Sequence, residues 1–360
     1  MMEGVIRLHV LRWRLFVPLL FLLLASCYQK AEPPADASRT VTDMAGRTLP
    51  VPDRIERVYV NRPGSVLMYA MAPDLLVNRP FRHSPAEQEF LLDSYNGLPY
   101  VDGSAEEIIR LHPDVIVSVF SINAASIEAA DKLSAKTGVP VFMLPMAVED
   151  YPRVFRLLGE LLDRREQAER MTGFVRQWLN PLMARAKAIP DSLRKRVYYA
   201  EGDRGLHTDP SGSFHSRAIA DAGGVNVADV KVMPGVGLSP VSMEQVLRWD
   251  PDVVLVWTGM GGKMTTMEHI GSDPLWSRAR AVRDGHLYQI PFLPFGWFDR
   301  PPGVNRILGT IWAAEMLYPD RFAIDLDKAT GEFFRIFYHR NLDDGELKRL
   351  LHPESAPPGR

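Results

Sequence analysis

The chain has 360 residues, of which 46% are hydrophobic and 24% charged, the composition of a globular protein with one large or two medium domains. Its formal net charge of −2 leaves no basic surface that would favour nucleic acid as a partner. A single cysteine excludes a disulfide framework and any cysteine-rich zinc or iron–sulfur site.

The first 26 residues predict an export signal. Three arginines precede the apolar run 15–25, which is too short to span a bilayer comfortably. The run ends in Leu24-Ala25-Ser26-Cys27, which resembles a bacterial lipobox, so we expect cleavage before Cys27 and acylation of its thiol. The alternative is a plain signal peptide with an incidental cysteine. Residues 27–39 are then a flexible tether, and we expect a periplasmic or cell-envelope protein with a lipid anchor in the membrane.

Short β-branched runs alternate with helical patterns from residue 58 onward, which indicates βα units around parallel sheets. The strands expected in a first lobe, residues 40–149, lie at 58–60, 75–77, 114–118 and 139–144. The strands expected in a second lobe, residues 189–325, lie at 196–200, 252–257 and 286–290. The fold class is therefore α/β, with two Rossmann-like lobes that contain mainly parallel sheets.

Two further helical segments are expected outside the lobes. Residues 150–188 carry apolar side chains at helical spacing and predict one long bridging helix, which Pro181 should kink or interrupt. Residues 326–360 predict a C-terminal helical extension, in which the aromatic side chains of Phe333, Phe334, Phe337 and Tyr338 suggest docking onto the rest of the protein.

Residues 104–117 are repeated at 242–255, with identical Ser, Glu, Arg, Pro, Asp and Val at equivalent positions. Each copy predicts a short helix with a serine cap and with Glu106 or Glu244 in its first turn, followed by a buried strand. Two interpretations of these glutamates stay open. One is the ordinary preference of a helix start for acidic residues. The other is a pair of matching carboxylates that meet a two-fold partner offering one cation per subunit.

The repeat resembles the E-x-x-x-x-L-x-PD-x-V element of the class III solute-binding proteins of ABC importers. Other segments resemble that family in the same order, at 41–58, 214–227, 276–291 and 308–319. The resemblance implies two lobes bridged by a long helix, in a monomer that delivers its ligand to an ABC permease dimer with its ATPase. It implies that Glu106 and Glu244 dock onto permease arginines. It also implies a metal chelate as ligand, first a ferric siderophore-type complex and alternatively haem or cobalamin, with no covalent cofactor beyond the lipid anchor.

Ligands of open α/β sheets lie beyond the carboxyl ends of the strands, which places the ligand in the cleft between the lobes. Aromatic faces and guanidinium groups suit a flat or anionic chelate. The candidate ligand-binding residues at strand ends are Asn61, Arg62, Arg82, His83, Phe120, Arg204, His207, Trp257, Phe295, Trp297 and Arg300. The alternative is ordinary packing for the aromatic residues and structural ion pairs for the arginines.

Direct metal coordination would involve His83, His207 or His215, none of which has a metal-ligand spacing in the sequence. His207, in a loop after a strand, is the best placed of the three. Catalytic signatures such as G-x-S-x-G and H-E-x-x-H do not occur in the sequence. We therefore expect a binding protein and not an enzyme. The alternative from another class is an exported metal-chelate enzyme of the chelatase kind.

Overall fold

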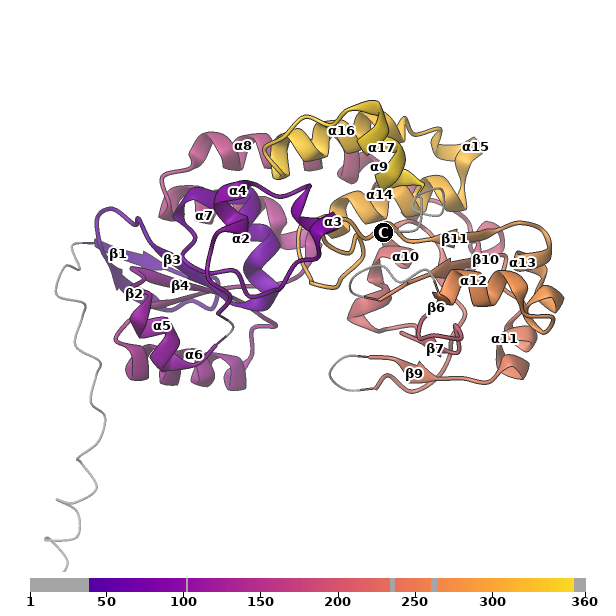
Figure 1. Cartoon of the computed structure of the whole chain (residues 1–360), viewed down its shortest axis with the longest axis horizontal. Helices are drawn as coiled ribbons and strands as arrows, with labels where there is room; N and C mark the ends of the chain where they lie inside the picture. The colour runs from indigo at the N-terminus through magenta and orange to yellow at the C-terminus, as the bar shows by residue number, and fades with distance from the viewer. Residues whose placement is uncertain (1–38, 102, 234–236, 260–264, 353–360) are drawn as a thin grey trace, which may run out of the picture.

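The structure is a computed structural model that describes residues 39–101, 103–233, 237–259 and 265–352. Two α/β lobes lie side by side, with helices running along one side of both (Figure 1). The fold class predicted from the sequence is thereby confirmed. The expected signal peptide and Cys27 lie outside the described residues. Of the helices in the described ranges, none has the length and apolar character that a membrane crossing requires.

A parallel sheet of order β3-β4-β5 forms the centre of the first lobe. Its strands are β3 (Val58–Val60), β4 (Val115–Val119) and β5 (Val141–Leu144), and all of their residues are buried, as in sheets covered on both faces. A hairpin of β1 (Arg39–Thr42) and β2 (Thr48–Val51) precedes the sheet. The helices of this lobe are η1 (Arg62–Gly64), α2 (Ser65–Met71), η2 (Pro73–Leu75), α3 (Pro85–Gln88), α4 (Asp93–Asn96), α5 (Ala105–Arg110), α6 (Ala124–Thr137) and η3 (Val148–Asp150).

The strand expected at 75–77 does not form. Pro73 starts the 3-10 helix η2, and only Leu76 makes an isolated parallel bridge, to Val58. The buried side chain of Asn78 takes the place of the missing strand at the edge of β3. Its Oδ1 accepts the N–H of Val60 at 3.0 Å, and its Nδ2 donates to the Val60 carbonyl at 3.0 Å. Asn78 thus anchors the start of the segment that leads to the candidate site.

The second lobe contains a parallel sheet of order β11-β10-β6-β8. Its strands are β6 (Arg196–Ala200), β8 (Val225–Asn226), β10 (Val253–Val256) and β11 (Leu287–Gln289). A small antiparallel pair, β7 (His207–Thr208) and β9 (Ser239–Pro240), forms a separate sheet that is joined to the end of β6 by a bridge between Glu201 and His207. The helices are η5 (Asp191–Leu193), η6 (Phe214–Ser216), α10 (Arg217–Asp221), α11 (Met243–Trp249), α12 (Thr265–Ser272), η7 (Trp276–Arg278), α13 (Arg280–Arg283), α14 (Asn305–Leu317) and α15 (Pro319–Phe322).

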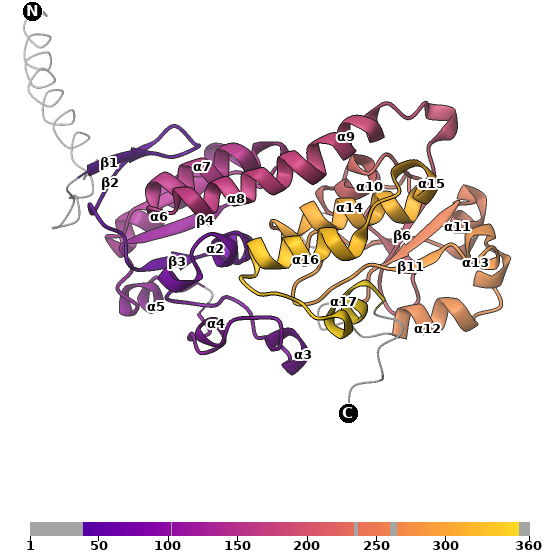
Figure 2. The ribbon, with the colours of Figure 1, turned by 90° about the horizontal axis from the view of Figure 1, so that it is seen from above.

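The connection between the lobes differs from the single helix expected over 150–188. Helix α7 (Tyr151–Leu161) ends where Asp163 adopts a φ of 55°, and α8 (Arg165–Phe174) folds back against it. The bridge is α8 together with the π-helical turn η4 (Val175–Leu179) and α9 (Asn180–Lys187), which run on without a break (Figure 2). Pro181 has no N–H to donate to the preceding turn, and the π turn directly before it accommodates that loss.

The C-terminal helix α16 (Leu326–Phe337) lies beside this bridge, and α17 (Asp344–Leu351) packs against α16 on the side away from the bridge (Figure 2). Phe333, Phe334, Phe337 and Tyr338 are at most 1% exposed. They belong to a hydrophobic cluster that includes residues of both sheets, such as Val60 and Leu255. Because the lobes share this core, we expect them to move little relative to one another.

The repeated segment has the same structural role in each lobe. In the first, Oδ2 of Asp114 accepts the N–H of Arg57 at 2.8 Å, and the Arg57 guanidinium donates to a carbonyl at the end of α5. In the second, Oδ2 of Asp252 accepts the N–H of Arg196 at 2.8 Å, and the Arg196 guanidinium donates to a carbonyl at the end of α11. The repeat therefore ties each short helix to the start of the central sheet.

Candidate ligand-binding site

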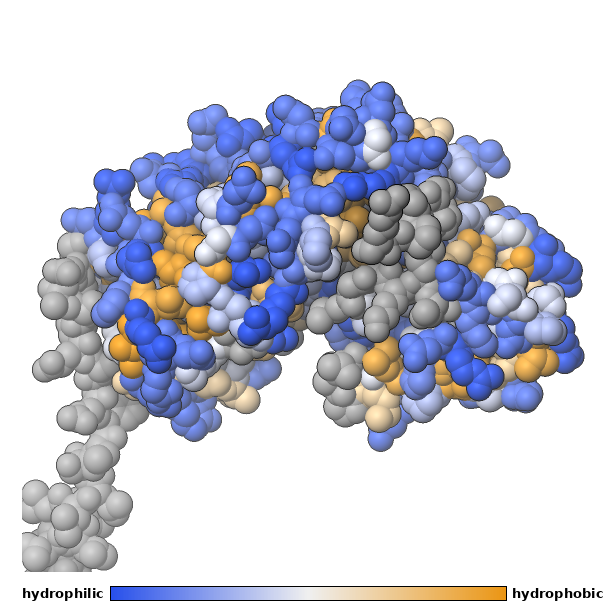
Figure 3. Space-filling view, viewed as in Figure 1, coloured by the Kyte–Doolittle hydropathy of each residue, from blue (hydrophilic) through white to orange (hydrophobic). Residues whose placement is uncertain are grey.

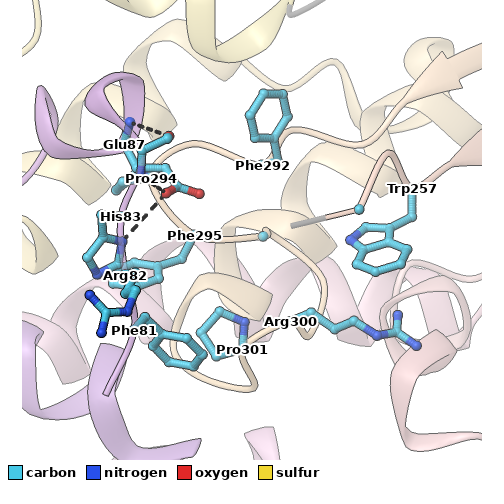
Figure 4. A pocket seen from close by; sticks show the side chains of 13 residues that line it. Phe81, Arg82, His83, Glu87, Trp257, Phe292, Pro294, Phe295, Arg300 and Pro301 are labelled. Atoms are coloured by element: carbon cyan, nitrogen blue, oxygen red, sulfur yellow. Dashed lines mark hydrogen bonds and ion pairs between the residues drawn. The ribbon is translucent and has the colours of Figure 1, made fainter. Parts of the chain in front are cut away.

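A cavity of about 280 Å³ lies where the two lobes meet. Residues 81–87 of the first lobe form one wall, and residues 257–259 and 292–301 of the second lobe form the other (Figure 4). The surface is notched between the lobes on the side away from α8 and α16 (Figure 3). Of the candidate ligand-binding residues, the cavity brings together Arg82, His83, Trp257, Phe295 and Arg300.

The first wall is organised by a capping box at the start of α3. The Ser84 side chain accepts the N–H of Glu87, while Oε2 of Glu87 accepts the N–H of Ser84 at 2.7 Å. Nδ1 of His83 lies 3.7 Å from the same oxygen, and the His83 side chain is only 3% exposed. Burial raises the pKa of Glu87, but the contacts with His83 and Ser84 outweigh it, so the pKa lies below its usual value. Glu87 is therefore an anionic group in the wall.

Two arginines of the first lobe stack on aromatic rings at the rim of the cavity. The Arg82 guanidinium lies 4.2 Å from the centroid of the Tyr100 ring, and the Arg62 guanidinium lies 5.3 Å from that of Phe81. Arg62 also donates to the Tyr100 hydroxyl at 3.2 Å. Both arginines are exposed, and Arg82 lines the cavity. A stacked, exposed guanidinium such as that of Arg82 is well placed to pair with an anionic group of a ligand.

The second wall contains a buried charge cluster around Arg300. Nη1 of Arg300 lies 2.8 Å from Oε1 of Glu201 and 3.5 Å from Oδ1 of Asp299, and Nη2 pairs with Asp209. The guanidinium also lies 4.5 Å from the Trp257 ring. Burial and the charges of Asp209 and Asp299 raise the pKa of Glu201, and the charge of Arg300 lowers it. The first effects are larger, so the pKa is about 9. The Arg300 charge is thus already balanced by carboxylates.

Several expected ligand contacts lie elsewhere. Trp297 is 1% exposed, and its Nε1 donates to the Leu293 carbonyl at 3.0 Å, because the proline-bracketed loop turns this ring into the core. Asn61 caps η1 and accepts the N–H groups of Gly64 and Val119 at 3.0 and 3.1 Å. These two side chains are structural, and neither lines the cavity.

Phe120, Arg204 and His207 do not line the cavity either. Phe120 follows β4 and is 47% exposed. The backbone of Glu201 pairs with that of His207 in both directions, at 2.8 and 3.0 Å, so the intervening residues form a tight reversal and Arg204 and His207 are exposed. Within the described residues, no group of three or more His, Cys, Asp or Glu side chains is arranged to hold a metal ion.

Ser84, Glu87 and Phe292 also line the cavity and are not among the residues expected from the sequence. The S-x-x-E spacing of Ser84 and Glu87 is the signature of a capping box, and it could have indicated a helix start at this position. Phe292 carries no comparable sequence signal.

Glu106 and Glu244 occupy equivalent places on the surface of the two lobes. Each is exposed, in the first turn of α5 or α11, behind a serine cap. Helices α5 and α11 lie toward opposite ends of the molecule, on the side away from α8 (Figure 1). The first-turn backbone N–H lowers the pKa of both carboxyls, and Lys136, 3.1 Å away, also lowers that of Glu106. Both carboxylates are charged at neutral pH.

The two lobes, the helical bridge and the cavity between the lobes define a class of two-lobed solute-binding proteins. The family model described as "Periplasmic binding protein" matches residues 67–293, and the chain belongs to this family. Its structural neighbours are class III periplasmic binding proteins of ABC transporters. The chain is accordingly a periplasmic solute-binding protein of an ABC transporter.

Three similar proteins cover nearly the whole chain. The molybdate-binding protein MolA of Haemophilus influenzae is 25% identical over 88% of this chain and 95% of its own. A solved structure of an ABC transporter solute-binding protein from Sulfurospirillum deleyianum is 30% identical, with a TM-score of 0.80 over 87% of this chain and 98% of that one. A periplasmic solute-binding protein from Veillonella parvula is 24% identical, with a TM-score of 0.70 over 88% of this chain and 97% of that one. All three are named as binding proteins.

Proposed function

We propose that this protein is a lipid-anchored solute-binding protein that captures a compact ferric chelate of the siderophore type and delivers it to an ABC permease. The observation that carries the proposal is the pairing of aromatic rings with an exposed guanidinium in one cavity. Phe81, Phe295 and Trp257 offer apolar surface to an organic chelator, and Arg82 offers a bidentate partner to its anionic oxygens.

The size of the cavity favours a compact ligand. Pockets for drug-sized molecules measure about 300–1,000 Å³, and this cavity, at about 280 Å³, lies at the lower limit. A haem or corrinoid macrocycle would enter this volume only in part, and the same holds for a large siderophore. The cavity accommodates a small chelate or part of a larger one that protrudes from the cleft.

A bare metal oxyanion is the second candidate. The small volume suits such an ion, and MolA, which is similar over 95% of its own length, is named for binding molybdate. Arg82 and the hydroxyl of Ser84 would be its donors in the first wall. The largely aromatic lining is the observation against it, because an oxyanion needs N–H and O–H donors on several sides.

Docking and anchoring complete the proposal. Glu106 and Glu244 would each meet a cation on one subunit of a permease dimer, since both are exposed carboxylates at matching positions of the two lobes. Cys27 would carry the lipid that holds the protein at the membrane.

The test is a tryptophan-fluorescence titration of the full chain with ferric citrate, a ferric catecholate, sodium molybdate, haem and cobalamin, with Trp257→Phe as the control. Saturable quenching by a ferric compound, lost in Trp257→Phe, is the expected result. Saturation by molybdate alone would select the second candidate, and saturation by none would refute both. Mass spectrometry of the recovered ligand tests the enzyme alternative, which requires a chemically altered product.

A further inference from the structure

The C-terminal helices lie across both lobes, close to the cavity. We call residues 326–351, which comprise α16, α17 and the connection between them, the C-terminal strap. Helix α16 packs on α2 of the first lobe, on α8 of the bridge and on α14 of the second lobe (Figure 2). The strap lies beyond residues 67–293, the part of the chain that the family model matches. The solute-binding function assigned above gives it no role.

The strap holds the first wall of the cavity through two arginines. Phe90, which follows α3, is fully buried, and the guanidinium groups of Arg349 and Arg340 lie 5.0 and 5.4 Å from its ring centroid. Nη1 of Arg349 lies 2.8 Å from Oε2 of Glu89, and Arg340 donates to the Glu89 carbonyl. Glu89 and Phe90 come directly after the helix that carries Glu87. The strap thus fixes the C-terminal end of the first wall.

The strap holds the second wall through a chain of hydrogen bonds. The Tyr338 hydroxyl donates to Oδ1 of Asn305 at 2.8 Å, and Nδ2 of Asn305 donates to the carbonyl of Phe295 at 2.9 Å. All three side chains are buried, and the Phe295 ring lies in the cavity wall. Tyr338 itself is fixed by stacking on Phe334, with ring centroids 4.5 Å apart. One end of α16 therefore sets the position of the Phe295 backbone.

The strap contacts described above hold the two walls whose aromatic rings meet across the lobes. The His83 ring of the first wall meets the Phe295 ring of the second edge-on, with centroids 5.1 Å apart. The contacts that join two lobes determine how far they can move against one another. The strap supplies such contacts on both sides of this ring pair.

We propose that the C-terminal strap sets the separation of the two cavity walls, with Tyr338, Arg340 and Arg349 as positioning residues. The inference rests on the proposed function only in taking this cavity as the ligand site. It states that the cavity is kept preformed in the absence of ligand, so that binding costs little ordering of the lobes.

Hydrogen exchange of the full chain without ligand tests the proposal. The amide of Phe90, bonded to the Glu87 carbonyl at 3.2 Å, reports on the first wall, and that of Trp297, bonded to the Pro291 carbonyl at 3.1 Å, reports on the second. We expect Arg340→Ala/Arg349→Ala to accelerate exchange about tenfold in peptides covering 84–92, and Tyr338→Phe to accelerate it about threefold in 292–300.

Two controls separate positioning from general stability. Arg335→Ala removes an arginine of α16 that pairs with Glu332 on the same helix, and it should leave both walls at wild-type exchange. Arg349→Lys keeps a cation beside Glu89 and should restore most of the protection that Arg349→Ala alone removes. Peptides covering β4 and β10 should not change in any variant.

Unchanged exchange at both walls would overturn the proposal, as would an equal rise in β4 and β10, which would make the strap a general stabiliser. Ligand titrations of the same variants with ferric citrate and sodium molybdate keep the two proposals apart. If neither compound binds but exchange at the walls responds as expected, the proposed ligands are wrong and the role of the strap is supported.

Discussion

Nη1 of Arg300 lies 2.8 Å from Oε1 of Glu201, in the wall of a cavity that both lobes line. This guanidinium is also paired with Asp209 and Asp299, so it lies in the cavity wall with its charge already compensated. The exposed guanidinium of Arg82 is therefore the group in the first wall better suited to an anionic ligand. The Arg300 guanidinium also packs against the ring of Trp257, 4.5 Å from its centroid.

The raised pKa of Glu201 makes the stability of the protein depend on pH. Burial raises this pKa from 4.5 to about 9, so the folded chain keeps a proton that the unfolded chain releases between these values. The contribution of this group to stability is present below about pH 4.5 and declines as the pH rises toward 9. Glu201→Gln, which mimics the neutral carboxyl, should remove this decline, so its stability should be close to that of the wild type at low pH and exceed it increasingly as the pH rises.

Urea unfolding at pH 5, 7 and 8.5 measures this effect. The free energy of unfolding of the wild type should fall relative to that of Glu201→Gln as the pH rises. Glu128→Gln, at an exposed position on α6, is the control and should follow the wild type. Parallel profiles of the wild type and Glu201→Gln would mean that Glu201 is ionised in the folded chain.

Removal of Arg300 should affect the stability of the fold, whereas removal of Arg82 should affect ligand affinity. Arg300→Ala leaves the buried carboxylate of Asp209 without its guanidinium partner and removes one partner of Asp299, which keeps its contact with His215. The substitution should destabilise the fold by about 3–5 kcal/mol. Arg82→Ala removes an exposed side chain, so its stability should change by about 0.5 kcal/mol or less, while ligand affinity falls at least about tenfold. Urea unfolding and fluorescence titration of both variants check this contrast. A strongly destabilised Arg82→Ala, or full ligand affinity in that variant, would contradict it.

Local sequence patterns predict the sheets and the repeat better than they predict the site. Val-rich runs bounded by turn residues locate β4 and β10, because a strand that is buried on both faces is largely apolar along its length. Trp297 and Phe295 are separated by one residue in the same loop, but only Phe295 lines the cavity. The direction of each ring follows from packing against α14, with which the Trp297 loop is in tight contact at Gly309, and no local pattern encodes that packing. No local pattern predicts the exposure of His207 either, because that exposure follows from the backbone pairing of His207 with Glu201.

The tryptophans of the second lobe should separate stability from binding. Trp297 is 1% exposed, so Trp297→Ala should cost about 3–5 kcal/mol of unfolding free energy through the void it leaves. Trp257 is only partly buried and lies at the cavity, so Trp257→Phe should keep nearly all of the stability and lose the quenching by ligand. Thermal unfolding of each variant, with titration of the folded fraction, distinguishes the two roles. If the Trp297→Ala variant folds normally but loses ligand affinity, Trp297 contacts the ligand.

Removal of the two surface glutamates should separate transport from binding. Glu106 and Glu244 are exposed and lie outside the residues that line the cavity, so Glu106→Ala/Glu244→Ala should leave ligand affinity unchanged within about twofold. If the two carboxylates dock onto permease cations, the same variant should abolish uptake by cells that depend on this importer.

Glu128→Ala, which removes an exposed carboxylate from α6, is the matched control and should support normal uptake. Each single substitution should reduce uptake partially, because one lobe would still dock. Normal uptake by the double variant would return both glutamates to the simpler role of stabilising a helix start, whereas weakened ligand binding would mean that they act on the cavity.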